Sequence, residues 1–379
     1  MKFVLVGPAH PFRGGISQYN TSLCEALRAE HQVLLISFSR QYPSFLFPGS
    51  AQTDKSGEVF TAQGERLLDS MGPLSWRRAA RRIRTFQPHA VIFQWWQPFF
   101  GPSYSGIIKR LKREIAVFFL CHNVYAHERI GLPGAKRLER WVIARTFRQV
   151  DGFLVHSAKL AEQVRRFNAT APIRRIYHPC YSFYSRWDGR ATAGSSKHRL
   201  LFFGKIRQYK GLDVFLKALR LVGDRLDYRA TIAGEFYVDP EPYRQMAGKW
   251  GLAGRLTWHD RYVRNEEVPR LFQQADLVVV PYRRATQSGV VPLAYEFDVP
   301  VVASDVGGLS EVVLDQKTGY LFPAGDARAL AERITEYFRD GKKEQFQRHI
   351  RCFKQNLSWD QVVDNILALL QASQEARKR

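Results

Sequence analysis

The sequence predicts an α/β protein with two doubly wound parallel-sheet domains. The chain has 379 residues, which suits two domains of ordinary size. Short apolar runs without polar alternation, typical of strands buried on both faces, alternate with segments of helical period. One polar, aperiodic stretch interrupts this alternation near the middle of the chain. A hydrophobic content of 45% excludes global disorder.

The first half of the chain is expected to form one domain over residues 1–183. Strand and helix candidates follow one another there, as in right-handed βαβ units. The expected strands are 2–6, 32–38, 89–94, 115–120 and 152–156, and the expected helices are 16–28, 76–86, 103–113, 137–149 and 158–167.

The second half repeats this organisation after a small and polar linker, residues 184–199. A second domain is expected over 200–356, followed by a terminal helix, 357–379, that could cross back to the first domain. The expected strands are 200–203, 228–233, 255–258, 276–280 and 300–303, and the expected helices are 211–222, 241–250, 266–274, 289–297 and 326–339. Ligands of such folds bind outside the carboxyl ends of the strands, so the cleft between the domains is the expected site.

The chain is strongly basic, with a net charge of +22, and residues 1–180 carry 26 Lys and Arg against 11 Asp and Glu. This balance indicates anionic partners, which could be nucleic acids, phosphates or an acidic lipid surface. No apolar run approaches the roughly 20 residues that span a bilayer, and no signal-peptide pattern follows Met1. The scattered cysteines lack metal-binding spacing, so reduced thiols and a cytoplasmic location are expected.

The loop after the first strand, GPAHPFRGGISQYN, has a glycine pair directly before a helix. It is not a dinucleotide fingerprint, because G-x-G-x-x-G is absent. Gly14 and Gly15 would let a phosphate or a sugar approach the backbone N–H groups at the helix N-terminus. A tight strand-to-helix turn explains the pair equally well, and both interpretations stay open.

A second stretch, LLFFGKIRQYKGLDVFLKAL, places cations directly after a strand. The strand ends at Gly204, and the cations that follow are Lys205, Arg207 and Lys210. Cations at the carboxyl end of a strand, beside a helix N-terminus, form a site for a diphosphate. Solvated surface lysines are the alternative, but α/β sheets bind their ligands at this position, which favours a site.

A third stretch, FFLCHNVYAHE, ends a buried strand in His122 and Asn123, with His127 one loop further on. Single histidines are more often structural than catalytic. The position at the carboxyl end of a strand favours a functional role for His122. For His127 the structural and the functional interpretation have equal weight.

Several of these stretches together resemble the retaining glycosyltransferases of family 4. The resemblance covers most of the second half through FFGKIRQYKGLDVFLKAL, ATIAGEF, ADLVVVPY and PVVASDVGGLSEVV. In the first half, RGGISQYNTSLCEAL and CHNVYAHE are similar more loosely. The resemblance implies the GT-B fold, in which two Rossmann-like domains face each other across a cleft, and sugar transfer from a nucleotide diphosphate.

The resemblance also implies roles for individual residues. In the family motif G-R-x-x-x-x-K-G the Arg and the Lys bind the donor diphosphate; here Lys205 replaces the Arg and Lys210 matches the Lys. The histidine that faces the transferred sugar corresponds to His122, which would act by hydrogen bonding. The nucleotide base and ribose would lie near Glu235, Tyr262 and Val263. In the first domain the acceptor or phosphate loop would comprise Arg13, Gly14, Gly15, Asn123 and His127.

The stretch DLVVVPYRRATQSGVVPLAYEFDVP departs from the family pattern. The family usually has E-x7-E here, two glutamates that hold donor hydroxyl groups, and this chain has Ala285 and Leu293 at those positions. A helix is expected to start here, and the first N–H groups of a helix lack partners within it. The backbone N–H groups of Ser288, Gly289 and Val290 could therefore donate hydrogen bonds to a phosphate or sugar oxygen. Gln287 could contact sugar hydroxyls. Glu296 could partly replace the ribose contact, although a solvent-facing glutamate is the simpler interpretation.

No H-x-x-x-H or D-x-D pattern occurs, so neither a metal nor a cofactor is expected beside the donor nucleotide sugar. The cationic side chains and a helix N-terminus would neutralise the leaving diphosphate instead.

Two basic stretches, 75–86 and 95–113, bear on a membrane partner. SWRRAARRIRTF places Trp76 and Ile83 on one helix face and its arginines largely elsewhere, which suits an anionic leaflet. A domain helix with arginines in water explains this pattern equally well. Together with the aromatic residues of WWQPFFGPSYSGIIKRLKR, the stretch suggests a peripheral enzyme at the cytoplasmic face of an inner membrane. No nucleic-acid-binding motif occurs.

The leading hypothesis is a metal-independent, retaining glycosyltransferase. It would move a sugar from a nucleotide-diphosphate sugar to a hydroxyl of a glycan or lipid-linked saccharide in cell-surface polysaccharide synthesis. The absent glutamates leave an alternative, a non-catalytic nucleotide-sugar-binding or assembly protein with the GT-B fold.

Overall fold

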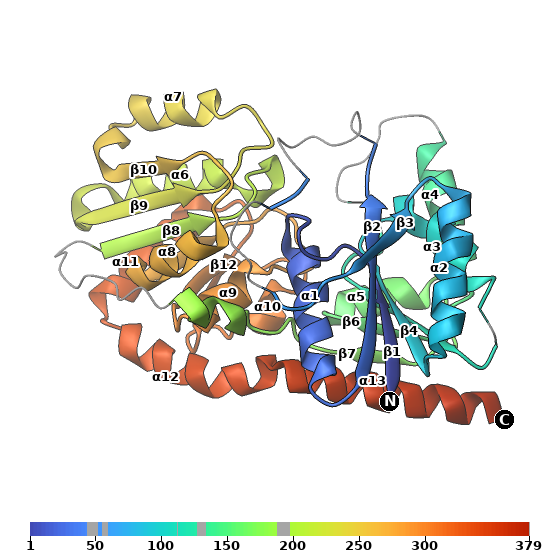
Figure 1. Cartoon of the computed structure of the whole chain (residues 1–379). Coiled ribbons are helices and arrows are strands. Elements are labelled where there is room, and N and C mark those ends of the chain that lie inside the picture. Colours follow the sequence, from blue (N-terminus) through green and yellow to red (C-terminus); the bar gives the residue numbers. More distant parts are fainter. Residues whose placement is uncertain (44–51, 55–59, 112, 127–133, 188–197, 379) are drawn as a thin grey trace. The chain divides into compact units, whose positions relative to one another are not determined.

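The computed structural model describes residues 1–43, 52–54, 60–111, 113–126, 134–187 and 198–378. The chain divides into two compact units, Met1–Tyr177 with Trp359–Arg379, and His178–Ser358 (Figure 1). The division after Tyr177 precedes the boundary expected at residue 183. Most of the linker expected over 184–199 lies outside the described residues, as does His127.

The first unit contains a seven-stranded parallel sheet in the order β3-β2-β1-β4-β5-β6-β7. Its strands are β1 (Lys2–Val6), β2 (Gln32–Arg40), β3 (Glu65–Asp69), β4 (Ala90–Trp95), β5 (Ala116–Cys121), β6 (Gly152–Val155) and β7 (Ile173–Arg175). Its helices are α1 (Gly15–Arg28), α2 (Pro73–Phe86), η2 (Pro98–Phe100), α3 (Gly101–Ile108), α4 (Ala135–Phe147), α5 (Ala158–Arg165) and α13 (Trp359–Lys378). Strand order reverses between β1 and β4, which makes that junction the topological switch point.

Both faces of this sheet are buried, which explains the continuous apolar runs of its strands. Val4 and Val6 belong to a core with side chains of α2, α3, α4 and α5, whereas Phe3 and Leu5 pack with side chains of α1 and α13. Alternate residues of a strand point to opposite faces, so a strand covered on both sides must be apolar throughout.

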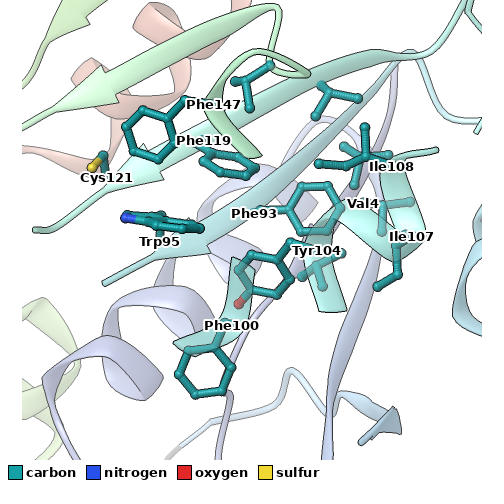
Figure 2. Packing of buried hydrophobic residues seen from close by; sticks show 14 of the residues in the cluster. Val4, Phe93, Trp95, Phe100, Tyr104, Ile107, Ile108, Phe119, Cys121 and Phe147 are labelled. Atoms are coloured by element: carbon teal, nitrogen blue, oxygen red, sulfur yellow. The ribbon is translucent and has the colours of Figure 1, made fainter. Parts of the chain in front are cut away.

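Aromatic rings fill the core between the sheet and α3–α4 (Figure 2). Trp95 of β4 stacks on Phe119 of β5, with ring centroids 5.4 Å apart, and Phe147 of α4 meets the Trp95 ring edge-on. Tyr104 of α3 lies 4.9 Å from Phe93. This packing fixes α3 and α4 against the carboxyl half of the sheet.

The second unit contains a six-stranded parallel sheet in the order β10-β9-β8-β11-β12-β13. Its strands are β8 (His198–Phe203), β9 (Tyr228–Ala233), β10 (Leu256–His259), β11 (Leu277–Val280), β12 (Val301–Ser304) and β13 (Gly319–Phe322). Its helices are α6 (Leu212–Val222), α7 (Glu241–Lys249), α8 (Val268–Gln274), α9 (Val290–Glu296), α10 (Leu309–Val312), α11 (Ala327–Arg339) and α12 (Lys343–Phe353), with short 3-10 turns that include η3 (Ser182–Trp187) and η4 (Gln208–Lys210). Its switch point lies between β8 and β11.

The prediction of two doubly wound parallel-sheet domains is confirmed, and most element bounds agree within two residues. Three strands were missed, and each lies at an edge of its sheet: β3, β7 and β13. The sequences of β3 (ERLLD) and β7 (IRR) are largely polar, because an edge strand needs less apolar side chain than a central one. The expected helix 103–113 ends earlier, at Ile108.

Candidate functional site

In the second unit, three predicted donor residues meet at the switch point between β8 and β11. Gly204 follows β8 with φ of 105°, a conformation that favours glycine. A Cβ at Gly204 would lie 3.3 Å from Lys210 Nζ and 3.6 Å from Val290 Cγ2. The ammonium group of Lys210 and the side chain of Val290, the first residue of α9, therefore both lie next to Gly204.

A chain of hydrogen bonds joins the cation to the start of α9. Lys210 Nζ donates to Tyr282 Oη at 2.8 Å, and Ser288 Oγ donates to the same oxygen at 3.3 Å. The backbone N–H of Val290 donates to Ser288 Oγ at 3.2 Å. Tyr282 thus links a positive charge to the small polar loop 285–289.

Lys210 stays a cation in this setting. Burial by itself would lower the pKa of its ammonium group, but the phenols of Tyr282 and Tyr209 outweigh burial, and the pKa is raised from its usual value. Lys210 Nζ also lies 4.7 Å from the centre of the Tyr282 ring. The site therefore carries a fixed positive charge at neutral pH.

The other two cations of this stretch share a different aromatic ring. Lys205 Nζ lies 5.3 Å and Arg207 Cζ 4.6 Å from the centre of the Tyr237 ring. All three predicted cations follow β8, but in this structure Lys205 and Arg207 contact Tyr237 and Lys210 contacts Tyr282.

Two glycines allow close approaches that hold the loops in place. Gly211 has φ of 70°, and a Cβ there would lie 2.0 Å from Pro281 O. Gly307 has φ of 59°, and a Cβ there would lie 1.7 Å from Ala285 O. The Gly308 N–H also donates to Thr286 O at 3.2 Å. The Gly307-Gly308 pair therefore supports the loop that carries Gln287 and Ser288.

Beneath that loop lies a buried pair of side chains, His178 and Tyr181. Tyr181 Oη donates to His178 Nε2 at 3.2 Å, and His178 Nδ1 donates to Pro179 O at 2.9 Å. A Cβ at Gly289 would lie 2.7 Å from Tyr181 Oη. Burial lowers the pKa of His178 to about 4, so the imidazole is neutral at physiological pH.

The residues expected near the nucleotide base lie at the ends of β9 and β10. Glu235 follows β9, and its carbonyl accepts from the Ile206 N–H at 2.9 Å, so β8 and β9 stay paired past their ends. Tyr262 and Val263 follow β10; Tyr262 is half-buried and Val263 is buried. Glu267, which pairs with the Arg261 guanidinium at 2.7 Å, steadies that loop.

The two positions of the missing acids differ in environment. Ala285 is half-buried in the loop, whereas Leu293 is 5% exposed in α9. Glu296 ends α9, at the end opposite the loop, and is half-buried rather than solvent-facing. Burial and the neighbouring Asp298 raise the pKa of Glu296, and Lys354 opposes this shift. A contact between Glu296 and a ligand at the helix start is therefore not supported by its position.

In the first unit, the switch point between β1 and β4 is tightly packed. A Cβ at Gly7, directly after β1, would lie 2.7 Å from Gln94 Cγ and 3.2 Å from Asn20 Nδ2. Asn20 Nδ2 donates to Pro8 O at 3.0 Å, which ties α1 to the loop after β1.

His122 follows β5 and lies in a buried cluster beside this switch point. Its side chain is 1% exposed, and Nε2 donates to Gln94 Oε1 at 2.8 Å. The His156 ring, from the end of β6, lies 5.2 Å away, and the Tyr19 ring of α1 meets His122 edge-on at 5.1 Å. Trp359 of α13 packs on Tyr19 at 5.0 Å. His122 is thus oriented by β4, β6 and α1.

The predicted glycine pair begins α1. Gly14 is the N-cap with φ of 110°, no side chain caps this helix end, and Gly15 is its first residue. The Arg13 N–H donates to Gln52 O at 2.8 Å. Asn123 is 9% exposed, and its carbonyl accepts from Cys121 Sγ at 3.5 Å. The glycine pair therefore lies at the start of α1, which agrees with both of the interpretations left open by the sequence.

Comparison with known proteins identifies the family. Residues 13–180 match the family described as Glycosyltransferase Family 4, and residues 197–340 match the one described as Glycosyl transferases group 1. The chain belongs to these family 4, group 1 glycosyltransferases.

Curated relatives of this family 4 chain include differently named glycosyltransferases. A D-inositol 3-phosphate glycosyltransferase of Streptomyces avermitilis is 26% identical over 252 residues, 60% of this chain and 53% of the relative. The lipopolysaccharide core biosynthesis mannosyltransferase LpsB of Rhizobium meliloti is 31% identical over 146 residues, 36% of this chain and 40% of the relative. The chain spans about half the length of the curated relatives it matches.

Solved structures show that the family 4 chain has the GT-B fold. Sucrose-phosphate synthase from Thermosynechococcus elongatus aligns over 100% of this chain and 99% of its own, with a TM-score of 0.70 and 18% identity. HepE from Anabaena, solved in complex with UDP, aligns over 98% of this chain and 100% of its own, with a TM-score of 0.72 and 15% identity.

Sequence reasoning missed five side chains that organise the two sites of this family 4 chain: Tyr181, Tyr282, His178, Gln94 and His156. The sequence position of Gln94 could have indicated its role, since an amide side chain at the end of an apolar strand needs a buried hydrogen-bond partner. The position of Tyr282 could also have indicated a role, because this residue follows Pro281 directly at the end of a strand, where α/β sheets bind ligands. No pattern in the sequence indicates that His156 and His178 are buried beside the predicted residues.

Neither a metal-binding cluster nor a membrane-spanning helix occurs among the described residues of this family 4 chain. No group of three or more His, Cys, Asp or Glu residues there could hold a metal ion. No described helix combines the length and apolar character needed to cross a bilayer.

Proposed function

We propose that this chain is a retaining glycosyltransferase that moves a sugar from a nucleotide-diphosphate sugar to a hydroxyl group. The observation that carries the proposal is the hydrogen-bonded chain from Lys210 through Tyr282 to Ser288, at the switch point of the second unit. A fixed cation next to small polar residues suits a diphosphate, and α/β sheets bind nucleotides at such points. The UDP bound by HepE, a protein of the same fold, agrees with this assignment.

The proposed reaction needs no carboxylate nucleophile. The bond between the anomeric carbon and the leaving phosphate oxygen breaks, and the acceptor hydroxyl oxygen bonds to that carbon on the same face. The hydroxyl proton passes to the leaving diphosphate. Lys210 would neutralise the charge that develops on the leaving group, which is the task a metal ion performs in other enzymes. Metal independence is part of this proposal.

The first unit would supply the acceptor side. His122, held by Gln94, would orient the reacting groups by hydrogen bonding, and Gly14-Gly15 would let a sugar or phosphate approach the start of α1. Gln94 is then a positioning residue.

The acceptor would be a glycan or a lipid-linked saccharide of cell-surface polysaccharide synthesis, at an anionic membrane. Helix α2 supports the proposal of a membrane partner, because it packs one face on the core of the unit and exposes most of its arginines. Ala79, Ala80 and Ile83 are buried against the unit, whereas its arginines other than Arg82 are exposed: Arg77, Arg78, Arg81 and Arg84. Arg82 pairs with Glu65 at 2.6 Å.

One observation favours a second candidate, a non-catalytic nucleotide-sugar-binding protein: neither Ala285 nor Leu293 can hold a donor hydroxyl as a glutamate does. Incubation with mixed UDP- and GDP-sugars and membrane extract as acceptor source separates the two. Release of free nucleotide together with a labelled product supports the transferase. Nucleotide-sugar binding without any product would instead support the second candidate and contradict the proposed transfer.

A further inference from the structure

A cavity of about 630 Å³ lies at the carboxyl edge of the first unit's sheet, among side chains that the proposed reaction does not use. Loops after β2, β3 and β4 contribute Tyr42, Met71 and Phe99, and helices α2 and α4 contribute Trp76 and Leu138. Its volume is within the roughly 300–1,000 Å³ of small-ligand sites, and most of its lining is apolar.

The cavity is preformed by rigid packing. Tyr42 stacks on Phe99 with ring centroids 5.6 Å apart, and Phe100 lies 5.3 Å from Tyr42. Phe100 and Tyr104 join this floor to the aromatic core in Figure 2. Trp76 is fixed as well: its Nε1 donates to Asp69 O at 2.8 Å.

Exposed apolar side chains gather around this cavity. Among the described residues six large hydrophobic side chains are exposed, and four of them lie just before α2, in α2 or in α4: Met71, Leu74, Leu138 and Trp141, with exposed fractions of 54%, 70%, 62% and 58%. Single exposed hydrophobic residues are ordinary, but a group around an apolar cavity marks an interaction surface. We call these four residues with the cavity the α2–α4 face.

The surroundings of the α2–α4 face are strongly basic. Besides the exposed arginines of α2, helix α4 exposes Lys136, Arg137, Arg140 and Arg145. A second hollow of about 390 Å³ shares Trp76, Pro102 and Val142 with the cavity and is lined by Lys109, Arg110 and Arg145. An apolar cavity next to a cationic hollow is complementary to an amphiphile with a hydrocarbon chain and an anionic head.

We propose that the α2–α4 face docks on an anionic bilayer and that the cavity takes one hydrocarbon chain of a lipid from that bilayer. The lipid phosphate lies at Lys109 and Arg145, and Leu138 and Trp141 enter the leaflet beside it. Basic residues on the same surface hold anionic headgroups within a Debye length. This inference rests on the proposed membrane partner and names the surface and the lipid class.

Flotation of the full chain with vesicles tests the docking. Vesicles of phosphatidylglycerol and phosphatidylethanolamine should bind the chain, and phosphatidylcholine vesicles should bind it far less. The double variant Leu138→Glu/Trp141→Glu should weaken binding at least about tenfold, because it removes two apolar side chains from the leaflet and places two negative charges next to anionic headgroups. Leu221→Glu is the matched control, since Leu221 is 45% exposed on α6 of the other unit. Equal binding by both variants overturns the proposed surface.

Calorimetric titration with a short-chain phosphatidylglycerol, below its critical micelle concentration, tests the cavity. The wild-type chain should bind one lipid, and Ala135→Phe, which fills the cavity, should abolish this binding. A wild type that binds no monomeric lipid, or an unchanged Ala135→Phe variant, overturns the chain site. Circular dichroism establishes that each variant is folded. Nucleotide-sugar binding by the wild type is a separate readout: lipid binding without it contradicts the proposed transfer but not this inference.

Discussion

The hydroxyl oxygen of Tyr181 lies 2.7 Å from the point where a Cβ on Gly289 would be, and 3.2 Å from His178 Nε2. Real Cβ atoms do not approach oxygen that closely, so Gly289 and Tyr181 set each other's position. The loop that carries Ser288 and the start of α9 therefore lie on a buried tyrosine–histidine pair.

Gly289→Ala tests this support. The added methyl group forces Tyr181 from its place, and we expect a loss of stability of about 1–3 kcal/mol, typical of overpacking, and weaker nucleotide binding. Tyr181→Phe should partly rescue the alanine variant, because the next atom, Cζ, lies at an ordinary contact distance of 3.7 Å. Urea denaturation of the two single variants and the double variant measures the coupling. Additive losses would contradict the proposed contact.

Acidification should weaken the same support. The pKa of His178 is lowered from 6.5 to about 4 by burial, so the unfolded chain binds this proton more readily than the folded one. The contribution to stability is complete above pH 6.5 and falls as pH decreases from 6.5 to about 4, by roughly 3 kcal/mol at about 1.4 kcal/mol per pKa unit. We expect a smaller loss over this range in His178→Gln, measured by chemical denaturation. Identical pH profiles would show that His178 does not titrate as inferred.

Gly307→Ala and Gly341→Ala form a matched pair, since both glycines have φ of 59°. A Cβ at Gly341 meets nothing within 4 Å, so only backbone strain of about 1–2 kcal/mol is expected there. A Cβ at Gly307 would collide with Ala285 O, so this variant should lose more stability and, because the loop 285–289 shifts, nucleotide affinity as well. Thermal melts with and without UDP compare the two. Equal effects would argue against support of the loop by Gly307.

Restoring the second family glutamate should harm the protein. Leu293 is 5% exposed, and Leu293→Glu would bury a carboxylate without a partner, which destabilises strongly. Leu293→Met, a volume-conserving control, should cost less than about 1.5 kcal/mol. The urea concentrations at the midpoints of unfolding compare the stabilities of the two variants. A stable Leu293→Glu variant with higher donor affinity would show that this position still faces the donor.

The sequence predicted the fold because central parallel strands are apolar throughout and helices separate them. The edge strands β3 and β7 escaped this logic, since their sequences are largely polar and they bury less side chain. The edge strand β13 was also missed, although it is apolar and mostly buried. The predicted donor residues Lys210 and Ser288 do lie close together in the structure, because both follow strands that are adjacent at a switch point.

The organisation of both sites could not be predicted, because it depends on partners that are distant in sequence. Tyr282 joins Lys210 to Ser288, and Gln94 holds His122 across 28 residues of chain. Local patterns carry no information on which buried polar groups pair in three dimensions. For Glu296, a local pattern suggested too much. Its helical spacing from Leu293 suggested a ligand contact, but Glu296 lies at the far end of α9, which does not support that contact.

In the proposed function, Lys210 binds the donor diphosphate. Calorimetric titration with UDP, GDP and their sugar conjugates, on the wild type, Lys210→Ala and the exposed-lysine control Lys249→Ala, tests it directly. We expect one of the nucleotides to bind the wild type and Lys249→Ala alike, and Lys210→Ala to bind at least about tenfold more weakly, as loss of a charge-assisted hydrogen bond implies. Equal affinity of Lys210→Ala and the wild type, or no nucleotide binding at all, would contradict the claim.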